Sequence, residues 1–351
     1  MSRDYSNELS PEVREKMKKN LVYIAIFSIV MIFAGFTSAY IVSMGDTFWV
    51  KYPLPKGFWV STLLIILSSI VYQVAVTKAV KRQLSSVRLL MVLTFGLGIG
   101  FAVFQWIGYG QLVEEGAHFR SSILVVDGRY GDYFEIKQQG KLVEVNANDF
   151  YLGGKKMTDA QMNALRNFAK PFEKTAEPTG YHINQLAPGF ELMYEHEPVS
   201  VQGGLLVTKG GKTLQYVDMR RLQYLAWNIR DGRGDFFHKG QLGKDFHVFY
   251  KGKELQYKNR ELVIGNKKLS APLQLKASQS RDTATSYLYI ITVLHLLHIV
   301  GASFYLLKMV VQSFTKPLEE KQVLSLRLGA IFWHFLGVLW IYLLVFLLYI
   351  H

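Results

Sequence analysis

The sequence contains no cysteine. Disulfide bonds, iron–sulfur clusters and thiolate copper centres all need cysteine sulfur, so none of them belongs to this chain. Acidic residues and arginine are also absent from the five long apolar runs, at 21–42, 57–80, 89–110, 286–311 and 328–350. Because charged side chains within a membrane usually mark transport or proton pathways, the absence of acids and arginine from these runs argues against a transporter.

Half of the 351 residues are hydrophobic, and the mean hydropathy is positive. A bilayer core takes about 20 helical residues, so each of the five apolar runs is long enough to span it. The sequence therefore predicts a tail and three transmembrane helices in residues 1–110, a soluble domain in residues 111–285, and two more transmembrane helices in residues 286–351.

Residues 111–285 are richer in Gly, Lys, Asp and Asn, and their apolar runs are of strand length. Turn signals at Asp127-Gly128 and Gln139-Gly140 separate the expected strands. Two amphipathic helices are expected, one after an N-cap at Thr158 or Asp159, and one over DMRRLQYLAWNI. The predicted fold class is thus an all-α membrane protein of five helices with an inserted, mainly β (α+β) domain.

One pattern inside the inserted domain occurs twice. GKLVEVNANDFYLGGKKMT, starting at Gly140, resembles GKELQYKNRELVIGNKKLS, starting at Gly252, with Gly and Lys residues recurring at a fixed offset. The pattern indicates a duplicated hairpin unit.

The orientation follows from Lys and Arg in the short connections. They gather in the N-terminal tail, between the second and third runs, and between the fourth and fifth runs. These three segments are expected on the cytoplasmic side, with the tail retained, which places residues 111–285 and the C-terminus outside. The net charge of +13 then reflects topology and gives no reason to expect nucleic-acid binding.

Two histidines stand in the fourth apolar run. His295 and His298 are three residues apart, so they share a helix face with Thr292 and, less closely, with Gly301. A polar side chain in lipid is costly, so this face is expected to look into the helix bundle. Gly301 is expected to let another helix approach closely.

This helix is similar to the T-G-x-H-x-x-H-V-x-x-G helix of subunit III of haem–copper cytochrome c oxidases. The last run resembles the closing W-H-F-x-D-x-x-W helix of the same family, over Trp333, His334, Phe335 and Trp340. The first three runs resemble its five-helix form, and Ser68, Ser69 and Gln73 are candidate interhelical hydrogen-bonding residues. The family's membrane carboxylates are replaced here by Ile29, Gly108 and Gly337, which removes any proton relay through them.

The resemblance implies an accessory, non-catalytic subunit of a proton-pumping terminal oxidase in a bacterial inner membrane. Haem and copper belong to partner subunits, because the chain lacks the cysteines of subunit II and the six membrane histidines of subunit I. Oxidase subunits I and II and phospholipids are the expected partners, and the chain would stabilise the catalytic subunit. The periplasmic domain is expected to dock cytochrome c or a quinol-oxidising complex, as in a respiratory supercomplex.

Two other functions stay open. Membrane b-type haems use two histidines on different helices, which makes His298 and His334 a candidate pair. A membrane sensor or transport protein with an extracytoplasmic ligand domain is the second. Within residues 111–285, Glu195-His196-Glu197 could meet at a metal only in a turn, and His118, His182, His238 and His247 are expected to be ordinary surface or core residues.

Overall fold

The computed structural model describes residues 10–124, 133–175 and 183–350. The chain forms two compact units. The first comprises Met1–Ser43, Leu54–Val113 and Ala284–His351, and the second comprises Met44–Pro53 and Glu114–Thr283. The turn predicted at Asp127-Gly128 and the residue His182 lie outside the described residues.

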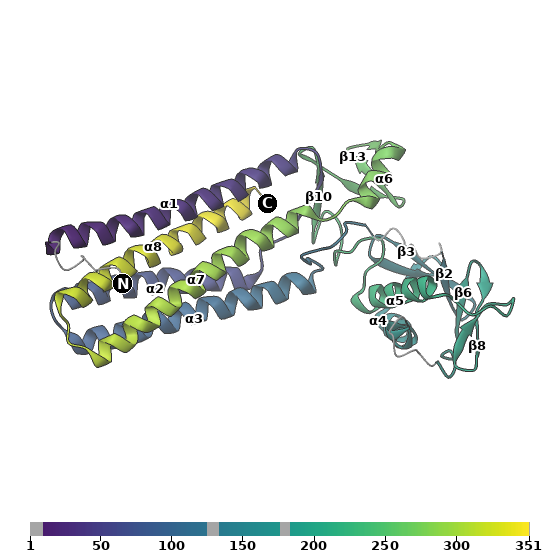
Figure 1. Cartoon of the computed structure of the whole chain (residues 1–351). Helices are drawn as coiled ribbons and strands as arrows, with labels where there is room; N and C mark the ends of the chain where they lie inside the picture. The colour runs from purple at the N-terminus through teal and green to yellow at the C-terminus, as the bar shows by residue number, and fades with distance from the viewer. Residues whose placement is uncertain (1–9, 125–132, 176–182, 351) are drawn as a thin grey trace, which may run out of the picture. The chain divides into compact units, whose positions relative to one another are not determined.

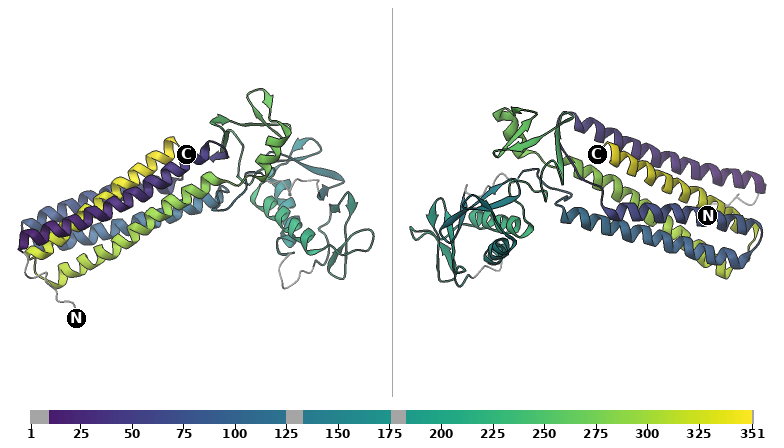
Figure 2. Two further views of the ribbon diagram at one scale, coloured as in Figure 1. Left: turned by 45° about the horizontal axis from the view of Figure 1, so that its top comes forward. Right: turned by 180° about the vertical axis from the view of Figure 1, so that it is seen from behind.

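The first unit is a bundle of helices that run side by side along their length (Figures 1 and 2). They are α1 (Pro11–Met44), α2 (Lys56–Val80), α3 (Leu84–Glu114), α7 (Thr283–Thr315) and α8 (Glu320–Tyr349). All five are long and apolar enough to cross a membrane, which confirms the five predicted spans. At 1.5 Å per residue even the shortest, 25 residues long, exceeds the roughly 30 Å of a bilayer core.

The two short connections of the bundle contact each other. The side chain of Arg82, in the turn between α2 and α3, donates a hydrogen bond to the carbonyl of Leu318, between α7 and α8. Arg88 Nε donates to the carbonyl of Ser313 at 2.9 Å. The basic α2–α3 and α7–α8 connections therefore lie at the same end of the bundle, as the charge rule requires.

The second unit is built mainly of antiparallel hairpins. A six-stranded sheet has the order β5-β4-β3-β2-β6-β7, and smaller sheets are formed by β8-β9, β1-β10-β11 and β12-β13-β14. The strands are β1 (Phe48–Lys51), β2 (Phe134–Gln138), β3 (Lys141–Asn146), β4 (Asp149–Leu152), β5 (Lys155–Lys156), β6 (Phe190–Tyr194), β7 (Glu197–Pro198), β8 (Ser200–Gln202), β9 (Leu205–Val207), β10 (His247–Tyr250), β11 (Lys253–Glu254), β12 (Gln256–Lys258), β13 (Glu261–Ile264) and β14 (Lys267–Lys268).

The helices of this unit are α4 (Asp159–Ala169), which continues into the 3₁₀ helix η2 (Lys170–Lys174), α5 (Tyr216–Asp231) and α6 (Ala271–Gln279). The helices α4 and α5 are the two helices that the sequence predicts. Thr158 is the N-cap of α4, and its hydroxyl accepts from the backbone N–H of Gln161. The region between α3 and α7 thus contains both strands and helices, which confirms the predicted α+β insertion.

The predicted repeat recurs in the strand registers. Lys137 pairs with Leu142 in the first hairpin, and 112 positions later Phe249 pairs with Glu254. The next hairpin repeats in the same way, because Val145 faces Phe150 and Tyr257 faces Leu262. The helices α4 and α6 then begin after N-caps at Thr158 and Ser270, again 112 positions apart. Strand pairing and helix start thus confirm the repeated unit.

A further copy lies between these two, which the sequence comparison misses. Its first hairpin pairs Met193 with Pro198, 56 positions after Lys137 and Leu142. Its second pairs Val201 with Leu206, 56 positions after Val145 and Phe150. The helix α5 follows in place of α4. We call β2–β5 with α4 the first repeat, β6–β9 with α5 the second, and β10–β14 with α6 the third.

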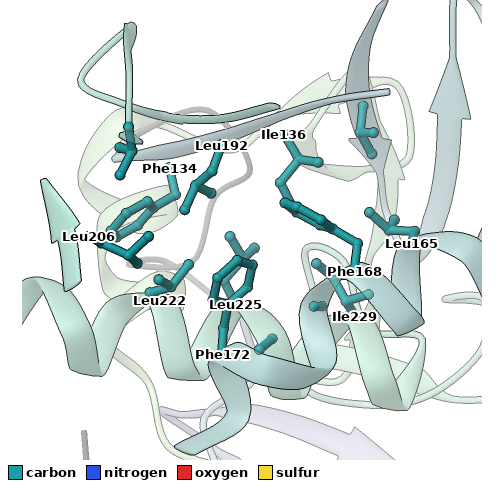
Figure 3. Packing of buried hydrophobic residues seen from close by; sticks show 14 of the residues in the cluster. Phe134, Ile136, Leu165, Phe168, Phe172, Leu192, Leu206, Leu222, Leu225 and Ile229 are labelled. Atoms are coloured by element: carbon teal, nitrogen blue, oxygen red, sulfur yellow. The ribbon is translucent and has the colours of Figure 1, made fainter. Parts of the chain in front are cut away.

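The first and second repeats share one apolar core (Figure 3). Their opening strands pair antiparallel, with Ile136 opposite Leu192 at the centre. Corresponding positions of α4 and α5 both point inward, as Leu165 and Leu222 show, each at most 1% exposed. Two similar units therefore bury their apolar faces against each other, because one hairpin unit alone is too small to do so.

The third repeat pairs with a strand from another part of the chain. Its opening strand β10 lies antiparallel to β1, with Val248 opposite Val50. The segment between α1 and α2 thus contributes to the second unit, although the sequence places no strand before residue 111. Phe48 is fully buried and stacks on Tyr250 at a centroid distance of 4.7 Å.

Candidate functional site

His295 on α7 lies where four helices of the bundle meet. Its Nε2 donates to the carbonyl of Leu336 on α8 at 3.0 Å, and the residue is fully buried. The rings of Phe33 on α1, Phe101 on α3 and Trp340 on α8 surround it, with centroids at 6.4, 5.9 and 5.3 Å. Its Nδ1 has no hydrogen-bond partner among the described residues. His295 thus faces the interior of the bundle, as predicted.

Trp333 connects α8 to α2 and α3. Its indole N–H donates to Ser68 Oγ at 3.1 Å, and the Ser68 hydroxyl donates to the carbonyl of Thr94 at 3.2 Å. The ring is 1% exposed and lies so close to Gly98 that a Cβ there would come within 2.8 Å of it. Ser68 therefore links three helices, as expected for an interhelical hydrogen-bonding residue.

His334 contacts the other two polar residues predicted on α2. Its Nε2 lies 3.0 Å from Gln73 Oε1, and its Nδ1 is hydrogen-bonded to the hydroxyl of Ser69. The amide oxygen accepts, so Nε2 carries the proton and Nδ1 accepts from the serine. A haem iron would need one of these nitrogens. Ligation by His334 would cost the bundle a helix–helix hydrogen bond, which weighs against the b-haem alternative.

Trp340, two helical turns further along α8, also contacts α2. Its indole N–H donates to Thr62 Oγ1 at 2.8 Å, and Phe58 meets its ring edge-on at 5.6 Å. Trp340 is fully buried. We call the hydrogen bonds of Trp333, His334 and Trp340 to α2 the α2–α8 interface. Satisfied indole and imidazole groups of this kind bind helices together in lipid.

The remaining motif residues on α7 have different surroundings. Thr292 is buried but donates to the carbonyl of Leu288 in its own helix, at 2.7 Å. His298 is only half-buried, and its Nδ1 bonds the carbonyl of Leu294 at 2.7 Å. Gly301 is exposed, and a Cβ there would meet nothing within 4 Å. The prediction of a close helix approach at Gly301 is therefore wrong within the described chain, because this face turns outward beyond His298.

Two helices approach each other closely at Gly57 and Gly108, a contact that the sequence does not predict. A Cβ on Gly57 would lie 2.7 Å from the backbone nitrogen of Gly108 and the carbonyl oxygen of Phe104. Gly96 and Gly100 have the four-residue spacing that often permits close helix packing, yet a Cβ on Gly96 would meet nothing within 4 Å. The spacing of glycines alone does not show which helix face another helix will cover, which explains why Gly57 is in close contact and Gly96 is not.

The three positions that replace the family's acids differ in their surroundings. Ile29, within α1, is 8% exposed and counts among the buried apolar residues. A Cβ on Gly108 would collide with the ring of Phe58 at 2.5 Å, while at Gly337 the nearest atom, from Ile65, lies at 3.7 Å. Glycine at position 108 thus serves close packing of α2 on α3.

The histidines of the second unit serve local structure. His238 is fully buried, hydrogen-bonded to the hydroxyl of Tyr52, with Asp282 Oδ2 3.9 Å from its Nε2. Burial, with the nearby charge of Arg233, lowers the pKa of His238 to about 3, so this imidazole is neutral. His247 lies 2.5 Å from Glu254 on the neighbouring strand.

Glu195 and His196 do lie in a turn, with positive φ angles of 49° and 68°. The His196 Nδ1 is 2.8 Å from Glu135, so the histidine contacts a carboxylate of the paired strand β2. Across residues 10–124, 133–175 and 183–350, no group of three or more His, Cys, Asp or Glu is placed to hold a metal ion.

The membrane site is therefore an arrangement of interhelical hydrogen bonds and aromatic contacts. Of the predicted residues, His295, Trp333, His334 and Trp340 form hydrogen bonds to other helices. Thr292 and His298 instead bond to carbonyl groups of their own helix, α7. The sequence analysis did not predict the role of Thr62, nor the hydrogen bond that Gln105 donates to Ser61 at 2.8 Å. A hydroxyl group in an apolar helix does not indicate which residue it will bond.

Comparison with known families agrees with this placement. The family Cytochrome c oxidase subunit III matches residues 276–351, a range that starts in α6 and contains all of α7 and α8. A search of curated proteins finds no match for the chain.

Proposed function

We propose that this chain, which is similar to subunit III of cytochrome c oxidase and carries that family's domain over residues 276–351, is an accessory subunit of a haem–copper terminal oxidase. Its role is of the subunit III type: the chain spans the membrane five times and associates with other oxidase subunits. The finer proposal is that it carries no electrons itself, stabilises the catalytic subunit and holds phospholipid.

The α2–α8 interface is the observation that carries this proposal. The family match ends in α8, yet the motif residues of α8 bind α2, more than 250 positions earlier in the chain. The part outside the match is therefore built to receive the motif, which supports a subunit III bundle of all five helices.

Purification from native membranes tests the proposal. A tag on the chain should bring down a catalytic subunit with haem and copper, in stoichiometric amount and with an oxidase spectrum. The chain expressed alone should show no Soret absorbance. Stoichiometric haem in the isolated chain would favour the b-haem alternative, and loss of that haem in His334→Gln would establish it.

The proposed orientation places the N-terminus and both basic connections in the cytoplasm. Because the chain has no cysteine, a single introduced cysteine reports on its own side of the membrane. In intact cells a membrane-impermeant maleimide should label Lys239→Cys in the second unit but not Lys316→Cys between α7 and α8; both lysines are exposed. The reverse pattern would invert the topology.

We further propose that the inserted domain docks the electron donor of the oxidase. Loops longer than about 15 residues are usually functional or disordered, and this one is folded. Lys and Arg outnumber Asp and Glu in residues 111–285. Such a surface attracts an acidic partner in a salt-dependent way.

A variant without the domain tests the docking proposal. Residues 115–282 are replaced by a short Gly/Ser linker, and Phe48, Trp49 and Val50 by Ser, because their partner strand β10 is removed with the domain. The oxidase should assemble and reduce oxygen with an artificial donor, but lose association with its native donor. Full turnover with the native donor would refute docking while leaving the subunit III role intact.

A further inference from the structure

A cavity of about 840 Å³ in the second unit is lined by five arginines: Arg120, Arg221, Arg230, Arg233 and Arg281. Three segments form its walls: residues 118–124, the helix α5 with the turn after it, and the residues before α7. Its volume falls in the range of roughly 300–1,000 Å³ typical of small-molecule sites. None of the predicted functions accounts for it.

The positive charge of the cavity is only partly neutralised. Asp231 is the single acidic residue in its lining, and it binds Arg230 at 2.8 Å and Arg233 at 3.6 Å. Outside the lining, Asp218 pairs with Arg221 at 3.4 Å and Glu173 pairs with Arg230 at 3.1 Å. For Arg120 and Arg281, both exposed, the described part of the chain supplies no ion pair. Like charges around one cavity repel one another, and this repulsion is relieved when an anion enters.

The deeper side of the cavity holds two basic groups in contact. Arg233 is 9% exposed, and its Nη2 lies 3.3 Å from Nε2 of His118. The guanidinium can only donate, so the imidazole accepts and is neutral. Burial and the charge of Arg233 lower the pKa of His118 accordingly. An anion placed here would receive a charge-assisted hydrogen bond from Arg233, and it would favour protonation of His118.

Part of the lining is aromatic. Trp227 and Tyr224 project from α5 and meet edge to face, with ring centroids 5.5 Å apart. Tyr224 is 46% exposed, although a ring of this size gains by being covered. A ligand with an organic part beside its anionic group would therefore use both linings.

We propose that this cavity binds a phosphate-bearing organic molecule, whose phosphate is held by arginines of the lining and whose organic part lies against Trp227 and Tyr224. Arginine favours phosphate because its planar fork donates two parallel hydrogen bonds to the oxygens. The phosphate comes either from a soluble phosphate ester or from the headgroup of an anionic lipid. This site does not depend on the role of the bundle in an oxidase.

The test compares two matched double variants of the full chain. Arg120→Gln/Arg281→Gln removes the two arginines without an ion pair. Lys239→Gln/Lys244→Gln removes two exposed lysines of the same unit that do not line the cavity. All four residues are exposed, so both variants should keep the fold, which circular dichroism and thermal unfolding verify.

Binding is measured in two arms. In the first, the protein in phosphatidylcholine nanodiscs is titrated calorimetrically with inorganic phosphate and with glycerol 3-phosphate. In the second, native mass spectrometry counts phosphatidylglycerol retained by the detergent-purified chain. We expect saturable binding in one of the two arms, and that arm identifies the source of the phosphate. The affinity should fall about ten-fold in the arginine variant and less than about two-fold in the lysine variant. No saturable binding in either arm, or equal weakening in both variants, overturns the proposal.

Discussion

The two units of this chain distribute polar and apolar side chains in opposite ways. In the bundle, many large apolar residues point outward, such as Trp106 at 74% and Phe304 at 70% exposed, while Gln105 and His295 are buried. In the inserted domain the large apolar residues of the first two repeats instead point inward, into the core that they share. Lipid and water as surroundings account for the contrast.

The difference teaches which forces order each unit. Water drives the repeats together, because pairing buries apolar faces that one repeat alone leaves exposed. Lipid exerts no such drive between helices, so the bundle depends on close glycine contacts and on hydrogen bonds such as those of the α2–α8 interface. Substitutions that act on one force alone should therefore affect only one unit.

The largest effect is expected in the core of the inserted domain. Leu165 is fully buried, so Leu165→Ala removes apolar contacts and leaves a cavity. We expect a loss of about 2–5 kcal/mol in the free energy of unfolding of this unit. Hydrogen exchange followed by mass spectrometry should show faster exchange in residues 133–175 and unchanged protection in α7 and α8.

Leu142→Ala serves as the control, since Leu142 is 37% exposed and should lose less than about 1 kcal/mol. The third repeat has Ala277, fully buried, at the position that corresponds to Leu165. Ala277→Leu should therefore overpack α6 and destabilise the unit by about 1–3 kcal/mol. Faster exchange in α7 and α8 in the Leu165 variant would contradict the independence of the two units.

Next in size is the close contact of α2 with α3. Gly57→Ala would push a Cβ into backbone atoms of α3 at 2.7 Å, which cannot move aside as a side chain can. We expect about 1–3 kcal/mol of destabilisation in detergent unfolding. Gly96→Ala, with open space around it, should be neutral or stabilise by up to about 1 kcal/mol through helix propensity. Equal behaviour of the two variants would refute the close approach.

The five spans, both predicted helices of the insertion and the repeat at one offset were all predictable from the sequence. Apolar run length, capping residues and fixed spacing are local signals, and each can be recognised without knowing which segments pair in the fold. The N-cap at Thr158 and the apolar side of α5 show this, since Leu222, Leu225 and Ala226 of this predicted amphipathic helix are buried. In the bundle, Ser68, Ser69 and Gln73 were predicted as bonding residues from their polarity alone.

What could not be predicted are choices between partners far apart in the chain. Nothing in the strand FWVK between α1 and α2 indicates that β10 will pair with it. The middle repeat was missed because its hairpins share only apolar spacing with the others, as Val201 and Leu206 show. Gly301 was misjudged for the same reason: helical periodicity gives the face of a residue, whereas its coverage depends on which helix lies opposite.

A smaller effect is expected from the α2–α8 interface. Trp340→Phe keeps an aromatic ring in place but removes the N–H that donates to Thr62. Interhelical hydrogen bonds in membranes contribute about 0.6 kcal/mol on average and about 1.7 kcal/mol at most, so the bundle should lose an amount in this range. Trp106→Phe, at a ring 74% exposed, should leave the unfolding free energy unchanged. A null result for Trp340→Phe would mean that the ring contributes through packing and that its hydrogen bond to Thr62 adds nothing.

The smallest effect is expected at the residue that precedes the helix in the first and third repeats. The hydroxyl of Thr158 accepts the backbone N–H of Gln161 at 3.4 Å, while Ser270 starts α6 without a hydrogen bond from its side chain. Loss of an N-cap costs about 0.5–2 kcal/mol, and a long, exposed hydrogen bond lies at the low end. Thr158→Ala should therefore destabilise the inserted domain by about 0.5 kcal/mol, and Ser270→Ala by less. The difference between the two variants, measured in urea, isolates the cap, because both lose a hydroxyl at the same place in the repeat. If Ser270→Ala costs as much as Thr158→Ala, the loss arises from the helix start itself and the capping hydrogen bond contributes nothing.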